Sequence, residues 1–139
     1  MKTELIFFDS FEQSKQGTLR GLIAIITLIA LDLIWFKISG HFNIYTSIIT
    51  KNPINYISAF LSWLLICSAI SVQLPKTLKE AMTYGMLVGL VVYGVWNFTN
   101  HAIMQWPIKT IIADTLWGMF VCSMASLSVY LIYHKPKLA

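Results

Sequence analysis

Four long stretches of the chain carry almost no charge, and they constrain the fold more than any other feature. The stretches lie between Arg20 and Lys37, between Lys51 and Lys76, between Glu80 and Lys109, and between Lys109 and His134. Each is close to the roughly 20 residues that a helix needs to cross about 30 Å of hydrocarbon. None shows the alternation of a membrane β-barrel strand. The sequence therefore predicts an all-α fold, a four-helix transmembrane bundle.

The composition agrees with a membrane protein. Of the 139 residues, 57% are hydrophobic and only 12% are charged, about half the charged share of a soluble domain. An ordinary water-soluble enzyme is therefore not expected, and two cysteines are too few for a disulfide framework. We expect a single membrane domain over residues 19–139, with no room for a separate catalytic domain. Its expected spans are approximately 19–37, 54–74, 80–99 and 108–133.

Residues 1–18 form a short N-terminal tail that mixes polar and aromatic side chains. Two interpretations stay open, a disordered tail or a short helix that rests its apolar residues in the membrane interface. A cleaved signal peptide is not expected, because the tail carries Glu4, Asp9 and Glu12 and no small-residue cleavage site follows its apolar run.

The basic residues predict the orientation. Four spans place both termini on the same side, and that side carries Lys2, Lys15, Arg20, Lys76, Lys79, Lys135 and Lys137, against Lys37, Lys51 and Lys109 opposite. By the positive-inside rule, the N and C termini are expected to be cytoplasmic. The net charge of +4 is then mostly a topology signal. No nucleic acid is expected as a partner, because short loops cannot offer a basic patch with stacking aromatics.

Polar side chains of three spans are expected at one depth, near the outer leaflet. They are Asp32 and Trp35 in the first span, Asn97, Asn100 and His101 at the end of the third, and Trp106, Asp114 and Trp117 around the start of the fourth. A carboxylate inside a bilayer is costly unless it is paired, solvated or protonated, so it suggests a functional site. The sequence leaves open whether Asp32 and Asp114 share a cavity or only hold helices together.

Small residues recur at every fourth position of the third and fourth spans. They are Gly85 and Gly89, in register with Asn97, and Gly118, Cys122 and Ser126, in register with Asp114. Such stripes let helix backbones approach closely. We therefore expect the third and fourth spans to pack face to face and to present Asn97 and Asp114 to each other.

Two D-x-x-W pairs, Asp32 with Trp35 and Asp114 with Trp117, share helical spacing. Each indole N–H is expected to reach its own carboxylate one turn away, or each ring to shield it from lipid. These aromatics, with Trp106, Tyr45 and Tyr56, fit an interfacial belt as well as a ligand cage. No metal and no cofactor are expected, because no pair of ligands shares one helix face; His101 also fits a solvated loop residue.

The chain resembles a family of small predicted four-helix integral membrane proteins that is catalogued as a domain of unknown function. The motifs are Leu31-Asp32-Leu33-x-Trp35, Tyr93-Gly94 leading into Asn97-Phe98-Thr99-Asn100, Trp106-Pro107 and Asp114-x-x-Trp117-Gly118. The resemblance extends from about Leu19 to Tyr133. It implies a four-helix fold and no particular activity. The family pattern usually has an aspartate where this chain has Asn97, which removes one intramembrane carboxylate.

Three functions compete. The leading hypothesis is a small transporter or ligand-binding membrane protein that takes a small polar or cationic solute in an outer pocket around Asp32 and Asp114. Such a transporter would need to form a homo-oligomer, because four helices make a narrow pathway. The first alternative is a structural or assembly protein whose D-x-x-W pairs lock helix packing. The second is an intramembrane acid–base enzyme acting on a lipid or isoprenoid. The sequence does not by itself identify an enzyme.

Overall fold

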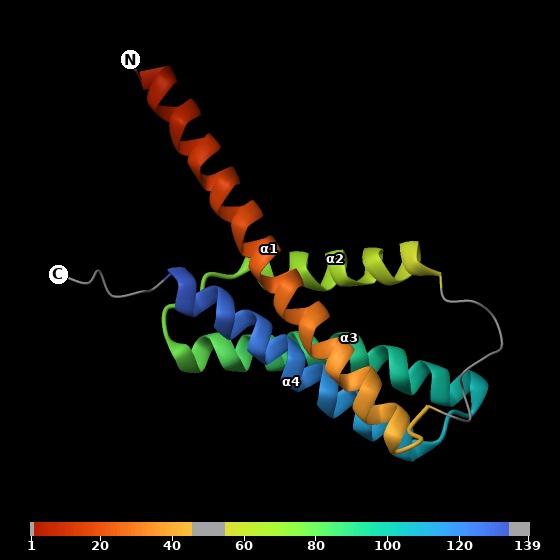
Figure 1. The fold of residues 1–139 in the computed structure, drawn as a ribbon. Helices are drawn as coiled ribbons and strands as arrows, with labels where there is room; N and C mark the ends of the chain where they lie inside the picture. Colours follow the sequence, from red (N-terminus) through yellow and green to blue (C-terminus); the bar gives the residue numbers. More distant parts are fainter. Residues whose placement is uncertain (1, 46–54, 134–139) are drawn as a thin grey trace.

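The computed structural model describes residues 2–45 and 55–133, with side chains from residue 15 onward, and folds them into four helices (Figure 1). They are α1 Lys2–His41, α2 Tyr56–Val72, α3 Leu78–Met104 and α4 Ile108–Tyr133. Outside the described residues lie position 54, where the second span was expected to begin, and Lys51, Lys135 and Lys137, which entered the orientation argument. The described chain is thus all-α, as the charge-free stretches predict.

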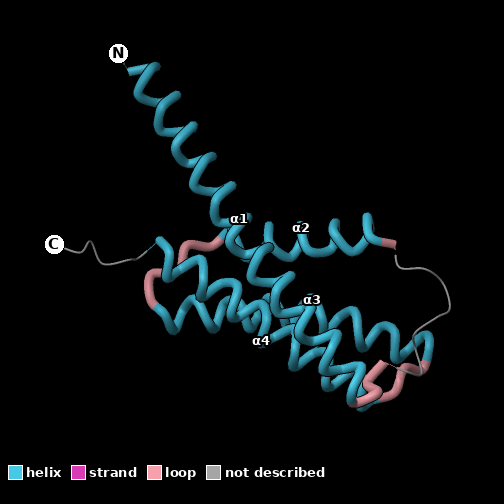
Figure 2. The backbone as a smooth tube through the Cα atoms, viewed as in Figure 1, coloured by secondary structure: helices cyan, strands magenta, loops and turns pink. Residues whose placement is uncertain are grey.

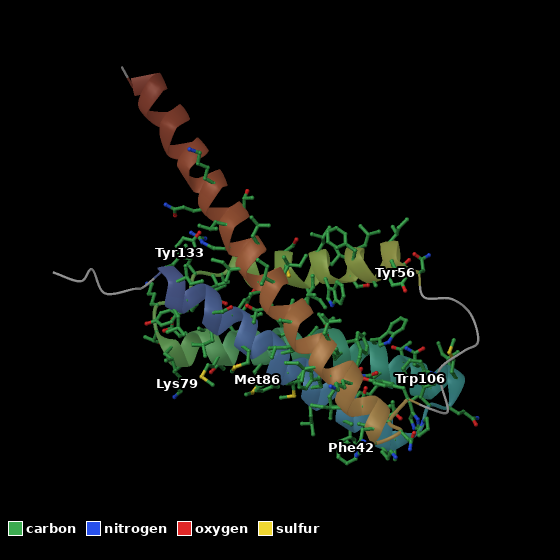
Figure 3. All side chains as sticks on the ribbon, viewed as in Figure 1. Phe42, Tyr56, Lys79, Met86, Trp106 and Tyr133 are labelled. Atoms are coloured by element: carbon green, nitrogen blue, oxygen red, sulfur yellow. The ribbon has the colours of Figure 1, made fainter. Side chains whose placement is uncertain are left out.

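The helices alternate in direction along the bundle. Figure 1 shows α1 and α3 running one way and α2 and α4 running back, and Figure 2 shows that the described loops between them are short. The α3–α4 connection and the end of α1 therefore lie at one end, and the α2–α3 connection lies at the other. Figure 3 marks these ends, with Phe42 and Trp106 at the first and Lys79 and Tyr133 at the second.

Helix α1 is longer than its expected span at both ends. Its 40 residues correspond to about 60 Å at 1.5 Å per residue, and its N-terminal half projects beyond the other helices (Figure 1). Residues 2–18 are therefore helical and continuous with the span, where the sequence left a disordered tail or a separate short helix open. No proline precedes Pro53, so nothing in this segment breaks the helix.

The ends of α3 follow from local chemistry. Thr77 caps its start, with Oγ1 accepting from the backbone N–H of Glu80 at 3.1 Å, while the Glu80 carboxylate accepts from the N–H of Lys76 at 2.9 Å. The arrangement is similar to a capping box, except that Glu80 bonds the N–H of Lys76 and not that of the N-cap residue Thr77. The helix continues to Met104, beyond the expected end at 99, and stops at the left-handed Gln105 (φ 54°). The following proline, Pro107, cannot continue α3 but can begin α4.

Large apolar side chains face outward on all four helices. Leu33, Leu65, Val95 and Leu116 are each more than half exposed, whereas the buried positions of α3 and α4 are rich in glycine, alanine, serine, threonine and cysteine. This distribution is typical of helices packed in lipid, where small residues make the helix contacts. Helices α3 and α4, together with the Lys15–His41 part of α1, are long and apolar enough to cross a membrane; α2, at 17 residues, is shorter.

Helices α3 and α4 approach closely at the glycine stripe. A Cβ atom on Gly85 would lie 2.3 Å from the backbone oxygen of Cys122, and one on Gly89 would lie 2.2 Å from that of Gly118. The Tyr93 ring fills the space at Gly118, where a Cβ would lie 2.1 Å from it. Ser126 is buried in the same helix. Backbone contact at this stripe fixes how the polar ends of α3 and α4 meet.

Candidate functional site

Asp32 of α1 lies between two tryptophans of other helices. Its carboxylate accepts one hydrogen bond from Nε1 of Trp63 in α2 at 2.8 Å and another from Nε1 of Trp117 in α4 at 3.0 Å. The residue is only 6% exposed. Both carboxylate oxygens therefore have a donor, and three helices are joined at this point.

Asp114, in the second turn of α4, has a different environment. One carboxylate oxygen accepts from the Tyr45 hydroxyl, and the other accepts from Nδ2 of Asn97 at 2.9 Å. Burial and the neighbouring Asp114 raise the pKa of Tyr45, so this loop side chain stays protonated and donates. Unlike Asp32, Asp114 is only partly buried. Both of its carboxylate oxygens nevertheless have a donor.

Asn97 connects the helix packing to this site. It is fully buried on α3, and its amide nitrogen donates both to Asp114 and to Oγ1 of Thr115, the latter at 3.2 Å. Among the described groups, none donates to its Oδ1. A buried acceptor without a donor costs about 1–3 kcal/mol, so Asn97 keeps unused hydrogen-bonding capacity beside Asp114.

A stacked pair of indoles links the two aspartates. The rings of Trp35 and Trp117 lie 4.8 Å apart and 6° from parallel. Nε1 of Trp35 donates to the Tyr45 hydroxyl at 2.7 Å, and that hydroxyl donates to Asp114. A continuous path of contacts therefore runs from Asp32 through Trp117, Trp35 and Tyr45 to Asp114.

The expected pairing within each D-x-x-W motif differs from the observed pairing. Trp117 donates to Asp32 of another helix, and Trp35 donates to Tyr45. Residues three apart share a helix face, so they point together toward a neighbouring helix. That geometry favours donation across the interface, and spacing alone does not reveal it.

A cavity of about 230 Å³ lies beside Asp114. Its lining residues come from α2, α3 and α4 and are Ser62, Trp63, Ile66, Val92, Tyr93, Trp96 and Asp114. Asp114 is the one charged side chain among these described residues, and three of the others are aromatic. Trp96 is 59% exposed, so the cavity reaches the surface of the bundle between α2 and α3. Asp32 is not part of the lining.

The remaining expected site residues, Asn100, His101 and Trp106, make their described hydrogen bonds and ring contacts with groups other than the two aspartates. Nδ2 of Asn100 donates to the backbone oxygen of Trp96 in its own helix, at 2.8 Å. Nδ1 of His101 lies 2.7 Å from the backbone oxygen of Trp106, and the Trp106 ring meets that of Trp96 edge-on. Asn100, His101 and Trp106 therefore stabilise the end of α3 and its loop. Among the described residues, no three His, Cys, Asp or Glu side chains gather as a metal site requires.

Sequence reasoning missed four residues of the site, or their roles. Trp63, Tyr93 and Trp96 occupy apolar spans in which an aromatic is unremarkable, and Tyr45 was considered for an aromatic belt or a ligand cage but not as a partner of Asp114. No charge marks them, and of the four only Tyr93 belongs to a motif of the family resemblance. Their common signal is a polar hydrogen on an otherwise apolar side chain, which needs a partner when it is buried.

Large apolar side chains face outward on the helices, and a few polar groups are buried between them, which is the reverse of the distribution in a soluble protein. This distribution defines a small multi-pass helical membrane protein. The chain belongs to the family described as predicted membrane protein DUF2177, which matches residues 18–131 and has no known function. This match confirms the resemblance carried by the four motifs. No curated protein and no solved structure matches the chain.

Proposed function

We propose that the protein is a ligand-binding membrane protein, acting as a small transporter, that takes a small cationic solute at Asp114. The observation that carries this proposal is the contrast between the two aspartates. Asp114 lines a cavity that reaches the surface, whereas Asp32 is sealed by two indole N–H groups. The ligand site is therefore centred on Asp114, and Asp32 supports it.

The lining favours a cation. A carboxylate offers the charge, and the faces of Trp63, Tyr93 and Trp96 offer the ring quadrupoles that attract ammonium groups. A cation–π contact contributes about 0.5–2 kcal/mol, more when it is desolvated. No lysine or arginine is among the described lining residues, so an anion would find nothing there to neutralise it.

The membrane placement proposed here has α2 as the fourth span and both termini in the cytoplasm. The 17 residues of α2 correspond to about 26 Å at 1.5 Å per residue, near the lower limit for a span. The excess of basic residues on the terminal side supports the orientation. Asp114, six residues into α4, is then about 9 Å from the start of that helix, close to the outer leaflet.

The two alternatives draw unequal support. A structural role suits Asp32, because its hydrogen bonds tie α1 to α2 and α4. The acid–base enzyme would use one aspartate as acid and the other as base at one substrate, and of the two only Asp114 is in the described lining of the cavity. The packing role of Asp32 and the binding role of Asp114 are therefore complementary.

Binding of tetramethylammonium to the purified protein in lipid nanodiscs tests the proposal. Trp63 and Trp96 line the cavity, so intrinsic fluorescence reports on occupancy. Asp114→Asn should weaken binding at least about tenfold, which corresponds to roughly 1.4 kcal/mol. Glu80→Gln is the matched control, since it removes an acid at the opposite end of α3 and should leave binding unchanged. Equal affinity of wild type and Asp114→Asn would refute the proposal.

Transport is tested separately in proteoliposomes. Uptake of radiolabelled tetramethylammonium should exceed that of protein-free liposomes and should fall to their level with Asp114→Asn. Binding without uptake would leave a ligand-binding protein and would contradict the transporter function.

A further inference from the structure

A second cavity continues from the proposed site along the seam between α2 and α3. It measures about 260 Å³ and is lined by Ala69, Leu87, Val88, Val91 and Val92, all of them apolar. Val92 also lines the cavity at Asp114. The two spaces are therefore neighbours, one with a charge and aromatic faces, the other without a polar group in its described lining.

The seam is open to the side and closed at its far end. Leu87 and Val91 are 56% and 54% exposed, so in a bilayer they would contact lipid. At the far end, the Tyr84 hydroxyl donates to the backbone oxygen of Ala69 at 2.6 Å and joins α2 to α3. A molecule can therefore enter the seam from the lipid. The seam ends at Tyr84 on one side and at the Asp114 cavity on the other.

The geometry points to an amphiphilic ligand, a single-chain alkyl ammonium compound whose head binds at Asp114 and whose tail lies along the α2–α3 seam. This inference rests on the proposed function and specifies its substrate class. Trp96 and Leu87 are nine residues apart on α3, which gives the seam a length of about 14 Å at 1.5 Å per residue. That length accommodates an extended alkyl chain.

The neighbouring Asp114 carboxylate distinguishes this seam, as a site for a cationic amphiphile, from the other described grooves of the bundle. Apolar cavities of about 410 Å³ between α1 and α2 and about 540 Å³ between α1 and α4 have no charged residue in their described lining. Lipid chains are as apolar as the seam, so burying a tail there gains little hydrophobic free energy over the bilayer. Affinity therefore comes from the head at Asp114, and the seam directs the tail.

Photolabelling locates the tail. A dodecyltrimethylammonium probe with a diazirine halfway along its chain is added to the protein in nanodiscs, irradiated, and mapped by mass spectrometry. The matched neutral probe is dodecanol with the same diazirine. The cationic probe should label residues 87–92 at least threefold more than the neutral probe. Asp114→Asn should abolish that excess, whereas Glu80→Gln should keep it.

A second variant separates this inference from the proposed function. Ala69→Phe fills the seam and should remove the excess labelling of residues 87–92, while tetramethylammonium still binds with wild-type affinity. Suppose that tetramethylammonium binding depends on Asp114 but that the alkyl probe labels α1 as strongly as the seam. That result would overturn the inference of an amphiphilic ligand and would leave the proposed function standing. If Asp114→Asn changes neither tetramethylammonium binding nor the labelling by the cationic probe, both the proposed function and the amphiphile inference are overturned.

Discussion

Replacement of Gly89 by alanine probes how helix packing builds the site. The added Cβ would lie 2.2 Å from the carbonyl oxygen of Gly118, and ordinary contact begins at about 3.4 Å. The α3 and α4 backbones must therefore part by about 1.2 Å along this contact, the difference of the two distances. The same separation would stretch the 2.9 Å hydrogen bond from Asn97 to Asp114 to about 4.1 Å, beyond hydrogen-bonding range.

The expected cost follows from three contributions. Overpacking destabilises by about 1–3 kcal/mol, and loss of the Asn97–Asp114 hydrogen bond adds about 0.5–1.5 kcal/mol. The better helix propensity of alanine returns about 1 kcal/mol. We therefore expect Gly89→Ala to lower the free energy of unfolding by about 0.5–3.5 kcal/mol.

The chain supplies a matched control on the same helix. A Cβ on Gly94 would meet only side-chain atoms of Leu90 and Thr115, each at 3.8 Å, so Gly94→Ala should be neutral or slightly stabilising. The free energy of unfolding is measured by dodecyl sulfate titration in mixed micelles, followed by circular dichroism. Equal stability of Gly89→Ala and Gly94→Ala would refute the packing argument.

Two further substitutions test the aspartates individually. Asp32→Asn leaves one acceptor oxygen for the two indole N–H groups of Trp63 and Trp117. We expect the free energy of unfolding to fall by about 1–3 kcal/mol in the same titration. Unchanged stability would contradict the hydrogen bonds described for Asp32. Asn97→Asp places a carboxyl group against Asp114, and two like charges this close cannot both ionise. Infrared spectroscopy at neutral pH should then show one protonated carboxyl band in addition to those of wild type, and its absence would show the two groups held apart.

Much of the fold is encoded locally and can be predicted. The four stretches without charge predict where the helices lie. The stripe of small residues predicts that Gly85 and Gly89 contact α4. The length of α1 could not be predicted, because polar residues in its first half permit a helix without requiring one. The end of α3 was expected at 99, but the helix continues to Met104 and stops at the left-handed Gln105, two residues before Pro107.

The sequence predicts the two aspartates of the candidate site, and it also predicts that Asn97 meets Asp114. Asp32 and Asp114 stand out because carboxylates are rare in apolar spans. Their partners Trp63 and Tyr45 do not, because an indole or phenol is compatible with both lipid and a hydrogen bond. The separate environments of the two acids depend on which helix each tryptophan faces. That arrangement follows from packing among all four helices and is not carried by any motif.

The most direct test of the account locates a bound cation relative to Asp114. Solid-state NMR in lipid, with ¹³C at the Asp114 carboxyl and ¹⁵N in tetramethylammonium, measures the dipolar coupling between the two nuclei. A carboxylate beside an aromatic cage predicts a separation of no more than about 6 Å, the range within which ring faces attract a cation. A saturably bound cation that shows no coupling to Asp114 would contradict the central claim.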